Sequence, residues 1–265
     1  MFQEITYINF NRQIAHNIWL MGFCSNDLAS FAKPGQFLMV HLIGTQKDPL
    51  LARPFSIHSV QDNDNLLILY KTVGKGTSLL SLLKEGDPIS VIGPLGKGFP
   101  LPEKNQRPLL VAGGMGIAPL FFLTQSLINL YQHEIKMFLG FSTSQEIVLF
   151  NELTNLGIDL SLATDDGSLG TKGMVTDLLD QYLDQESNKI PLIYACGPVD
   201  MLKRISLKAI SLNLRCYVSL ESHMACGLGL CQGCAVKVNN IDKPYYYVCQ
   251  DGPVFLAEMI DWETL

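Results

Sequence analysis

The sequence predicts a multi-domain protein of the β + α/β class: an antiparallel β-barrel, a doubly wound parallel sheet and a small cysteine-rich unit. Three observations carry this prediction. Residues 1–101 contain short apolar runs separated by turn sequences, as in small antiparallel barrels. Residues 102–217 alternate strand-like and helix-like segments, as in doubly wound parallel sheets. Residues 218–265 lose the helical period and gather glycine and cysteine.

The first unit is predicted to contain mainly strands. Its apolar runs are rich in β-branched and aromatic residues, and the turn sequences KPGQ, QDNDN, VGKGT and KEGD separate them. TSLLSLL, which follows Gly76, is the one helix that the pattern predicts here. The predicted strands are residues 17–23, 35–43, 54–60, 65–73 and 87–95.

The second unit begins after the polar linker PEKNQRP. RPLLVAGGMGIAPLFFLTQSLINLYQ predicts a strand, a glycine-rich turn and a long helix. Further strands are predicted at residues 134–143, 157–168 and 191–198, with helices at 171–185 and 199–213. The alternation of strands and helices favours parallel strands joined by helical crossovers.

Composition narrows the class of function. The net charge of −6, without a basic cluster, argues against a nucleic-acid partner. No run of 18 apolar residues occurs, so no membrane span is expected. The first residues lack the features of a signal peptide, and a cytoplasmic protein is expected. Its seven cysteines are then expected to be reduced, metal-bound or catalytic, with Cys24 and Cys216 in the core.

Four cysteines near the end of the chain have the spacing of a metal centre. Cys226, Cys231 and Cys234 follow the pattern C-x4-C-x2-C, and Cys249 follows after fourteen intervening residues. This is the plant-type arrangement for a [2Fe–2S] cluster, in which four thiolates hold two irons. Structural zinc and unligated buried thiols are the alternatives, although zinc usually takes two C-x2-C knuckles.

Glycines between the first parallel strand and its helix indicate a nucleotide site. In LLVAGGMGIAPLFF, Gly114 and Gly116 allow a diphosphate to approach the backbone near a helix N-terminus. The motif departs from G-x-G-x-x-G because Pro119 takes its last place, and an ordinary strand–helix turn is the alternative. Cys196, in YACGP, ends the last predicted parallel strand. It is expected either to face the ligand crevice or to be a small buried residue.

Two motifs of the first unit also suit phosphate. Arg53 in LLARPFSIHS offers a guanidinium fork, and Ser56 follows after two residues. Gly76 and Thr77 in VGKGTSLL open the predicted helix with N–H groups. In isolation, the four residues from Arg53 to Ser56 would favour an ordinary arginine on a solvated strand.

Taken in order, these motifs resemble the ferredoxin–NAD(P) reductase superfamily. RPFSI, ILYKTVGKGT, GPLGKGF and SLESHMACGLGLCQGC together are similar to the electron-transfer subunits of type B dihydroorotate dehydrogenases, and the resemblance covers nearly the whole chain. Subunits of sulfide dehydrogenase or of NADH-dependent ferredoxin oxidoreductase are the alternative.

The resemblance implies three cofactor sites. Cys226, Cys231, Cys234 and Cys249 would ligate the [2Fe–2S] cluster, and NAD would bind over Gly114 and Gly116 with its ring near Cys196. GFSTSQEI offers hydroxyl groups and Glu146 rather than basic residues, which favours NAD over NADP. The FAD contacts would be Arg53, Pro54, Phe55, Ser56, Leu69, Tyr70, Lys71, Gly76 and Thr77.

The resemblance also implies a partner. This would be a separate FMN-containing catalytic subunit of the (β/α)8-barrel fold, which oxidises dihydroorotate in pyrimidine biosynthesis. Two copies of each chain would form a heterotetramer. The present chain would then be an oxidoreductase subunit that passes electrons from [2Fe–2S] through FAD to NAD+, and no acid–base residue for dihydroorotate chemistry is expected in it.

Overall fold

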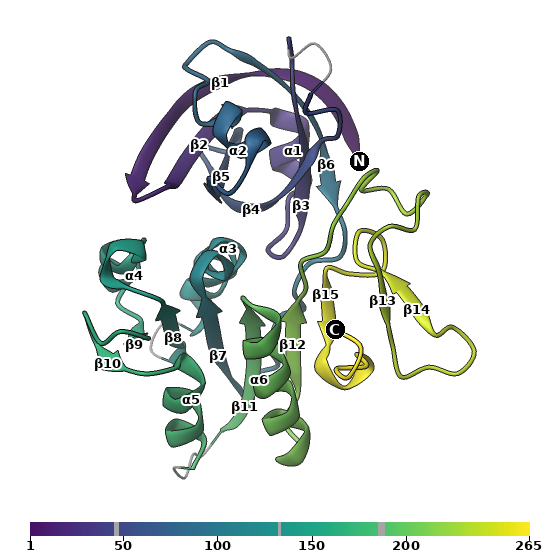
Figure 1. Ribbon diagram of the computed structural model, residues 1–265. Helices are drawn as coiled ribbons and strands as arrows, with labels where there is room; N and C mark the ends of the chain where they lie inside the picture. The colour runs from purple at the N-terminus through teal and green to yellow at the C-terminus, as the bar shows by residue number, and fades with distance from the viewer. Residues whose placement is uncertain (45–47, 132–133, 185–188) are drawn as a thin grey trace.

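The computed structural model describes residues 1–44, 48–131, 134–184 and 189–265. A barrel lies at one end, a parallel sheet with helices on both faces lies at the other, and the C-terminal segment runs beside both (Figure 1). Within those residues, the helices are too short or too polar to cross a lipid bilayer.

The first unit is a closed antiparallel barrel in the strand order β1-β2-β5-β4-β3-β6, which confirms the prediction. Its interior holds fully buried side chains such as Met21, Phe23, Leu38 and Ile68, since alternate residues of each strand point inward. The strands are β1 (Phe2–Ala15), β2 (Ile18–Cys24), β3 (Phe37–Leu42), β4 (Arg53–Gln61), β5 (Asn65–Lys71) and β6 (Pro88–Leu95).

Two short helices accompany the barrel. α2 (Lys75–Leu80) is the predicted helix. α1 (Asn26–Phe31) was not predicted, although Ser25 caps it: the Leu28 N–H donates to the Ser25 hydroxyl at 3.1 Å.

The second unit is a seven-stranded sheet in the order β10-β9-β8-β7-β11-β12-β15. The first six strands in this order are parallel, as expected, and β15 (Val254–Leu256) pairs antiparallel with β12. The others are β7 (Gln106–Gly113), β8 (Lys136–Phe141), β9 (Asp159–Thr164), β10 (Thr171–Lys172), β11 (Ile190–Cys196) and β12 (Cys216–Ser219).

The helices cover this sheet on both faces. Side chains of α3 (Ile117–Tyr131) and α4 (Phe150–Asn155) belong to one core cluster, and those of α5 (Val175–Leu183) and α6 (Val199–Ser211) belong to another. The first cluster also contains Leu67 and Leu69 of the barrel. One apolar cluster therefore joins the barrel to the sheet, beside the separate core in the barrel interior.

His58 of β4 marks the contact between the barrel and α3. Its ring stacks on Phe121 with centroids 4.6 Å apart, and Nδ1 lies 3.3 Å from the Ala118 carbonyl oxygen. The side chain is 2% exposed, and this burial lowers its pKa to about 4. The imidazole is therefore neutral at physiological pH.

The C-terminal segment is anchored to both larger units. It forms a two-stranded sheet of β13 (Ala235–Lys237) and β14 (Tyr245–Tyr247). Short 3-10 turns also occur in the described part of the chain, including η1 (Gly114–Gly116), η3 (Ser144–Glu146) and η4 (Ala257–Met259). β15 extends the parallel sheet, while the Lys97 N–H donates to the Gly252 carbonyl at 2.6 Å.

Candidate cofactor sites

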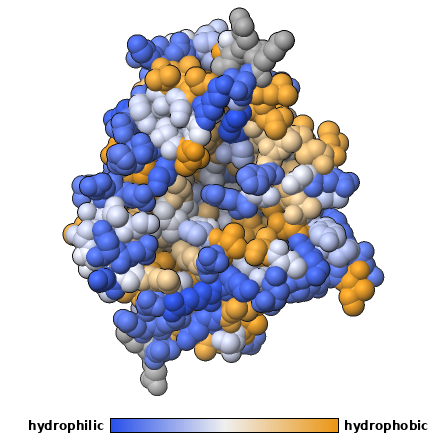
Figure 2. All heavy atoms as spheres, viewed as in Figure 1, coloured by the Kyte–Doolittle hydropathy of each residue, from blue (hydrophilic) through white to orange (hydrophobic). Residues whose placement is uncertain are grey.

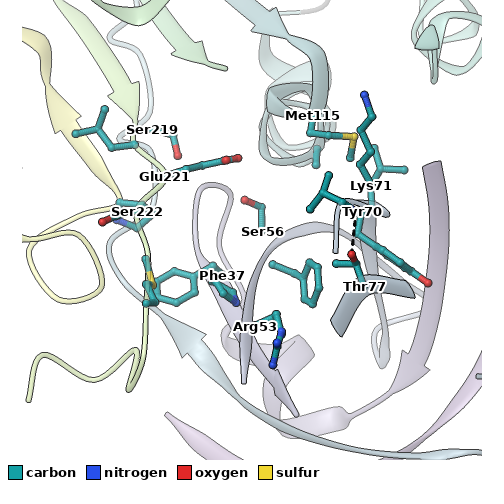
Figure 3. A pocket seen from close by; sticks show the side chains of 18 of the residues that line it. Phe37, Arg53, Ser56, Tyr70, Lys71, Thr77, Met115, Ser219, Glu221 and Ser222 are labelled. Atoms are coloured by element: carbon teal, nitrogen blue, oxygen red, sulfur yellow. Dashed lines mark hydrogen bonds between the residues drawn. The ribbon is translucent and has the colours of Figure 1, made fainter. Parts of the chain in front are cut away.

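A first cavity of about 420 Å³ lies between the barrel and the start of the C-terminal segment. β4 and β5 form one wall, and residues 219–224 form the facing wall (Figure 3). Figure 2 shows the surface hollowed between the barrel and the parallel sheet. The cavity is thus built from segments more than 140 residues apart in the sequence.

The FAD contacts predicted in the barrel lie close together in the structure. Most of them line the first cavity: Arg53, Pro54, Phe55, Ser56, Leu69, Tyr70, Lys71 and Thr77. Gly76 lies beside them, because a Cβ atom placed on it would collide with the Arg53 guanidinium. The Arg-x-x-Ser and Gly-Thr motifs therefore meet at one end of the cavity, although 23 positions separate Arg53 from Gly76.

Internal hydrogen bonds hold two of these side chains in place. The Thr77 hydroxyl accepts from the Val73 N–H at 2.9 Å and donates to the Gly74 carbonyl at 3.0 Å, which fixes the turn before α2. The Tyr70 hydroxyl donates to Asn11 Oδ1 at 2.9 Å, and burial raises its pKa above the usual range. Both groups are preorganised polar contacts in a mostly apolar cavity.

A second cavity of about 660 Å³ opens at the carboxyl ends of β7, β8 and β11. Gly113, Gly114 and Gly116 line it, with Gly197 and Pro198 facing them. A ligand crevice is expected at this position in a doubly wound sheet, where the strand order reverses between β7 and β11. A Cβ atom on Gly116 would collide with the Cys196 carbonyl, so only glycine allows the two turns to pack this closely.

The Cys196 thiol itself lies in the core. It is 1% exposed and, in the described part of the chain, is not among the residues that line either cavity. Burial raises its pKa, and the nearby Glu221 carboxylate adds to this effect. Its predicted place beside a nicotinamide ring stays a prediction. Of the two cysteines expected in the core, Cys216 is buried, whereas Cys24 is exposed at the end of β2.

Three residues line both cavities: Lys71, Met115 and Glu221. Lys71 forms a 2.7 Å ion pair with Glu146, which also lines the second cavity. Glu221 projects from the end of β12 toward Ser56 and Met115 (Figure 3). Glu221 is exposed where the cavities open to solvent, but partial burial of its carboxyl group raises the pKa of that group. The cavities therefore adjoin one another.

Met115 and Glu221 were missed in the sequence. Met115 stands between the two predicted glycines and gives no signal of its own. Glu221 precedes the first cysteine of the cluster by five positions, in SLESHMAC. That proximity is the one clue that this segment serves a site.

The four predicted cysteines converge on one loop region. The Cys234 and Cys249 sulfur atoms are 3.3 Å apart, and the Cys231 thiol donates a hydrogen bond to the Cys226 sulfur. Among the described residues, no group of three or more His, Cys, Asp or Glu side chains is arranged so that it could hold a metal ion. Two sulfur pairs suit a two-iron cluster, in which each iron takes two cysteines, better than one zinc ion.

Backbone N–H groups point at these sulfur atoms. Cys226 Sγ accepts from the N–H groups of Leu228 at 3.3 Å and Cys231 at 3.4 Å, and Cys249 Sγ accepts from Gly229 at 3.1 Å. Burial opposes ionisation of Cys226, but these donors prevail and lower its pKa to about 7. Burial and the adjacent Cys234 instead raise the Cys249 pKa to about 12. The N–H groups that surround Cys226 therefore favour its thiolate form, the form that binds metals.

Two family models match the chain. The model described as the iron-sulfur cluster binding domain of dihydroorotate dehydrogenase B matches residues 221–261, and the oxidoreductase NAD-binding domain matches residues 110–206. A curated relative from Desulforamulus reducens is 40% identical over 94% of this chain and 95% of its own length. One from Caldanaerobacter subterraneus subsp. tengcongensis is 38% identical over the same shares. Both are named dihydroorotate dehydrogenase B (NAD(+)), electron transfer subunit.

Solved structures agree on the fold. A chain of an NADH-dependent reduced ferredoxin-NADP oxidoreductase, described for flavin-based electron bifurcation, matches with a TM-score of 0.86 and 32% identity; the match covers 99% of this chain and 91% of that one. The ferredoxin NADP+ reductase of Neisseria gonorrhoeae, with bound FAD and NADP, matches with a TM-score of 0.67 and 17% identity, covering 79% and 91% of the two chains. At that identity the second likeness concerns the fold alone.

Proposed function

Because the chain belongs to the family of electron transfer subunits of NAD(+)-dependent dihydroorotate dehydrogenase B, we propose that it carries electrons from a dihydroorotate-oxidising partner to NAD+. One structural observation supports this proposal above the others. The cysteine loop, the first cavity and the second cavity follow one another, since residues 219–224 line the first cavity and lead directly to Cys226. When bound, a [2Fe–2S] cluster carries single electrons, a flavin exchanges one or two, and nicotinamide accepts a hydride.

The first cavity would hold FAD. The Arg53 guanidinium and the turn at Gly76 and Thr77 would bind its phosphates, while Ser56 and Tyr70 would contact the rest of the molecule along β4 and β5. The fit rests on this donor set: a cationic fork, a fixed turn with free N–H groups and apolar walls.

The second cavity would bind NAD in preference to NADP. Gly114 and Gly116 would let its diphosphate approach the backbone. The basic side chains that line this cavity, among the described residues, are Lys71 and Arg204, and carboxylates already pair with both. The acidic side chains that line it are Glu146, Asp165, Asp200 and Glu221. An additional 2′-phosphate would therefore meet repulsion.

Cys226, Cys231, Cys234 and Cys249 would hold the [2Fe–2S] cluster. The partner would be an FMN-containing catalytic subunit in a cytoplasmic heterotetramer of two copies of each chain, serving pyrimidine biosynthesis. The present chain would supply no acid–base group for dihydroorotate chemistry.

The test is co-purification of this chain with the FMN-containing subunit from its native extract, followed by an assay of dihydroorotate-dependent NAD+ reduction. The expected result is NADH formation by a complex that contains iron, sulfide, FAD and FMN. A coloured chain that does not use dihydroorotate but reduces ferredoxin would favour the alternative, a ferredoxin-linked reductase. The 32% identical structure is a protein of that kind. A colourless, zinc-containing chain would contradict both functions.

A further inference from the structure

A thin apolar partition separates the first cavity from the cysteine loop. Phe37 of β3 lines the cavity, and Met39, two residues on, pairs in register with Pro54 of the flavin-site strand. Phe37, Met39 and Leu95 share one buried core with Cys234 and Cys249. The barrel wall that bounds the cavity is therefore the wall on which the cysteine region packs.

Gly227 touches this wall directly. The residue is buried and has a φ of +69°, the left-handed region that favours glycine. A Cβ atom on it would lie 2.6 Å from Met39 Cγ, 2.9 Å from Met39 Sδ and 3.5 Å from Leu95 Cδ1. Met39 is 1% exposed, so close-packed neighbours enclose its side chain. A side chain at position 227 therefore requires either Met39 or the loop to shift.

We propose that Gly227 is a positioning residue: it lets the cysteine loop seat on Met39, and this contact sets the separation between the four sulfur atoms and the first cavity. The inference rests on the proposed function, because the separation matters only if electrons pass between the loop and the cavity. Electron tunnelling falls steeply with distance, so a displacement the size of one methyl group changes the rate.

The experiment uses the assembled complex and four variants at this contact. Gly227→Ala adds the methyl group from the loop side. Met39→Phe enlarges the contact from the barrel side and leaves every loop residue unchanged. Gly227→Ala/Met39→Ala keeps the strained φ but removes the obstacle, and Met39→Leu is the conservative control. Cofactor content is measured first, from the visible spectrum and from iron and FAD analysis.

The distance-sensitive readout is electron paramagnetic resonance of half-reduced protein, in which each paramagnetic centre broadens the signal of the other. We expect weaker coupling and severalfold slower electron transfer in Gly227→Ala and in Met39→Phe. The double variant should recover coupling close to the wild-type value, and Met39→Leu should have the wild-type coupling.

Three outcomes decide the matter. Unchanged coupling in Met39→Phe with both cofactors present would overturn the positioning role and leave the proposed function intact. A double variant as weakly coupled as Gly227→Ala would also overturn it, since the effect would then come from the strained backbone. Wild-type complex without iron or FAD would instead refute the proposed function, and this inference with it.

Discussion

Lys71 of β5 and Glu146 of η3 form a 2.7 Å ion pair that joins the barrel to the parallel sheet where the two cavities adjoin. Their side chains are 32% and 27% exposed, so the pair lies at the rim rather than in the core. Such a pair contributes little to stability, about 0–1 kcal/mol. Its position gives it a second consequence, because Lys71 is a cation within reach of any anion in the second cavity.

Neutralising Glu146 should strengthen nucleotide binding. Glu146→Gln releases Lys71 from its carboxylate and removes one of the negative charges around the second cavity, so we expect ADP-ribose to bind severalfold more tightly. Lys71→Met should bind it more weakly. Isothermal titration calorimetry measures both, and the free energy of unfolding should change by less than about 1 kcal/mol in either variant. Weaker binding by Glu146→Gln would show that Glu146 serves the ligand rather than Lys71.

Stability should fall in mild acid because of His58. Its pKa is about 4 in the folded protein, against 6.5 when unfolded, so the unfolded state takes up a proton first as pH falls. The stabilisation is therefore complete above pH 6.5 and is lost as pH decreases toward 4. We expect His58 to account for about 2 kcal/mol of lost stability between pH 7 and pH 5.

Urea unfolding at the two pH values tests this expectation. His58→Gln should show a smaller pH dependence than the wild type, while His16→Gln, at an exposed turn position, should keep the wild-type dependence. Equal dependence in all three proteins would assign the acid sensitivity to other groups.

The barrel was predicted from five apolar runs, but β1 was not recognised. In this strand Ile5 and Tyr7 are 64% and 61% exposed, whereas Thr6 is 7% exposed. Apolar residues of β1 thus face outward, where a half-buried strand normally has polar ones. The alternation of apolar and polar residues therefore fails to predict this strand. Thr6 is accommodated because its hydroxyl donates to the Cys24 carbonyl at 2.5 Å. Only the folded barrel shows this partner.

The sites were predicted to a different extent. The cysteines and the β4 and β5 residues belong to local motifs whose spacing reflects chemistry, and the structure brings them together. Phe37, Met115 and Glu221 belong to no such motif. Phe37 lies on β3 of the barrel, whereas Met115 and Glu221 reach the first cavity because η1 and the segment after β12 lie beside the barrel, a tertiary arrangement that no local pattern encodes.

Replacing Cys231 by serine should remove the cluster. The Cys231 thiol donates a hydrogen bond to the Cys226 sulfur, and a serine at position 231 cannot supply the second thiolate of that pair. We expect loss of the cluster's visible absorption and of dihydroorotate-dependent NADH formation. Flavin-dependent reduction of a dye by NADH should persist since, among the residues that the structure describes, none of the four cysteines lines the first cavity. Cys24→Ser, at an exposed cysteine of the barrel, is the matched control. Full coupled activity in Cys231→Ser would exclude electron transfer through the cluster.

Leu230 should contribute to partner binding. It is 79% exposed and directly precedes Cys231 in the cysteine loop, where the proposed function places the entry of electrons from the partner. Leu230→Asp should weaken assembly with the catalytic subunit by about tenfold or more, as a central apolar contact does. Analytical ultracentrifugation measures the affinity, and Leu212→Asp, at the C-terminal end of α6, is the control. Unchanged assembly would place the interface elsewhere.

Alanine substitutions at Gly114 and Gly116 should separate two reasons for glycine in the nucleotide loop. Gly114 has a φ of +52° but open space around it, so Gly114→Ala should destabilise the protein by only about 1–2 kcal/mol, the cost of the left-handed backbone. Gly116 has no such φ, but its Cβ atom would collide with the Cys196 carbonyl, and overpacking costs about 1–3 kcal/mol.

Because this collision separates the β7 and β11 turns that both line the second cavity, Gly116→Ala should also weaken NADH binding at least tenfold. Fluorescence titration with NADH and thermal unfolding measure the two effects, with Gly74→Ala, whose added methyl group meets open space, as the control. Gly114→Ala should also weaken NADH binding, because its methyl group would lie where the diphosphate is proposed to approach the backbone. Unchanged NADH binding in Gly114→Ala would contradict that placement of the diphosphate.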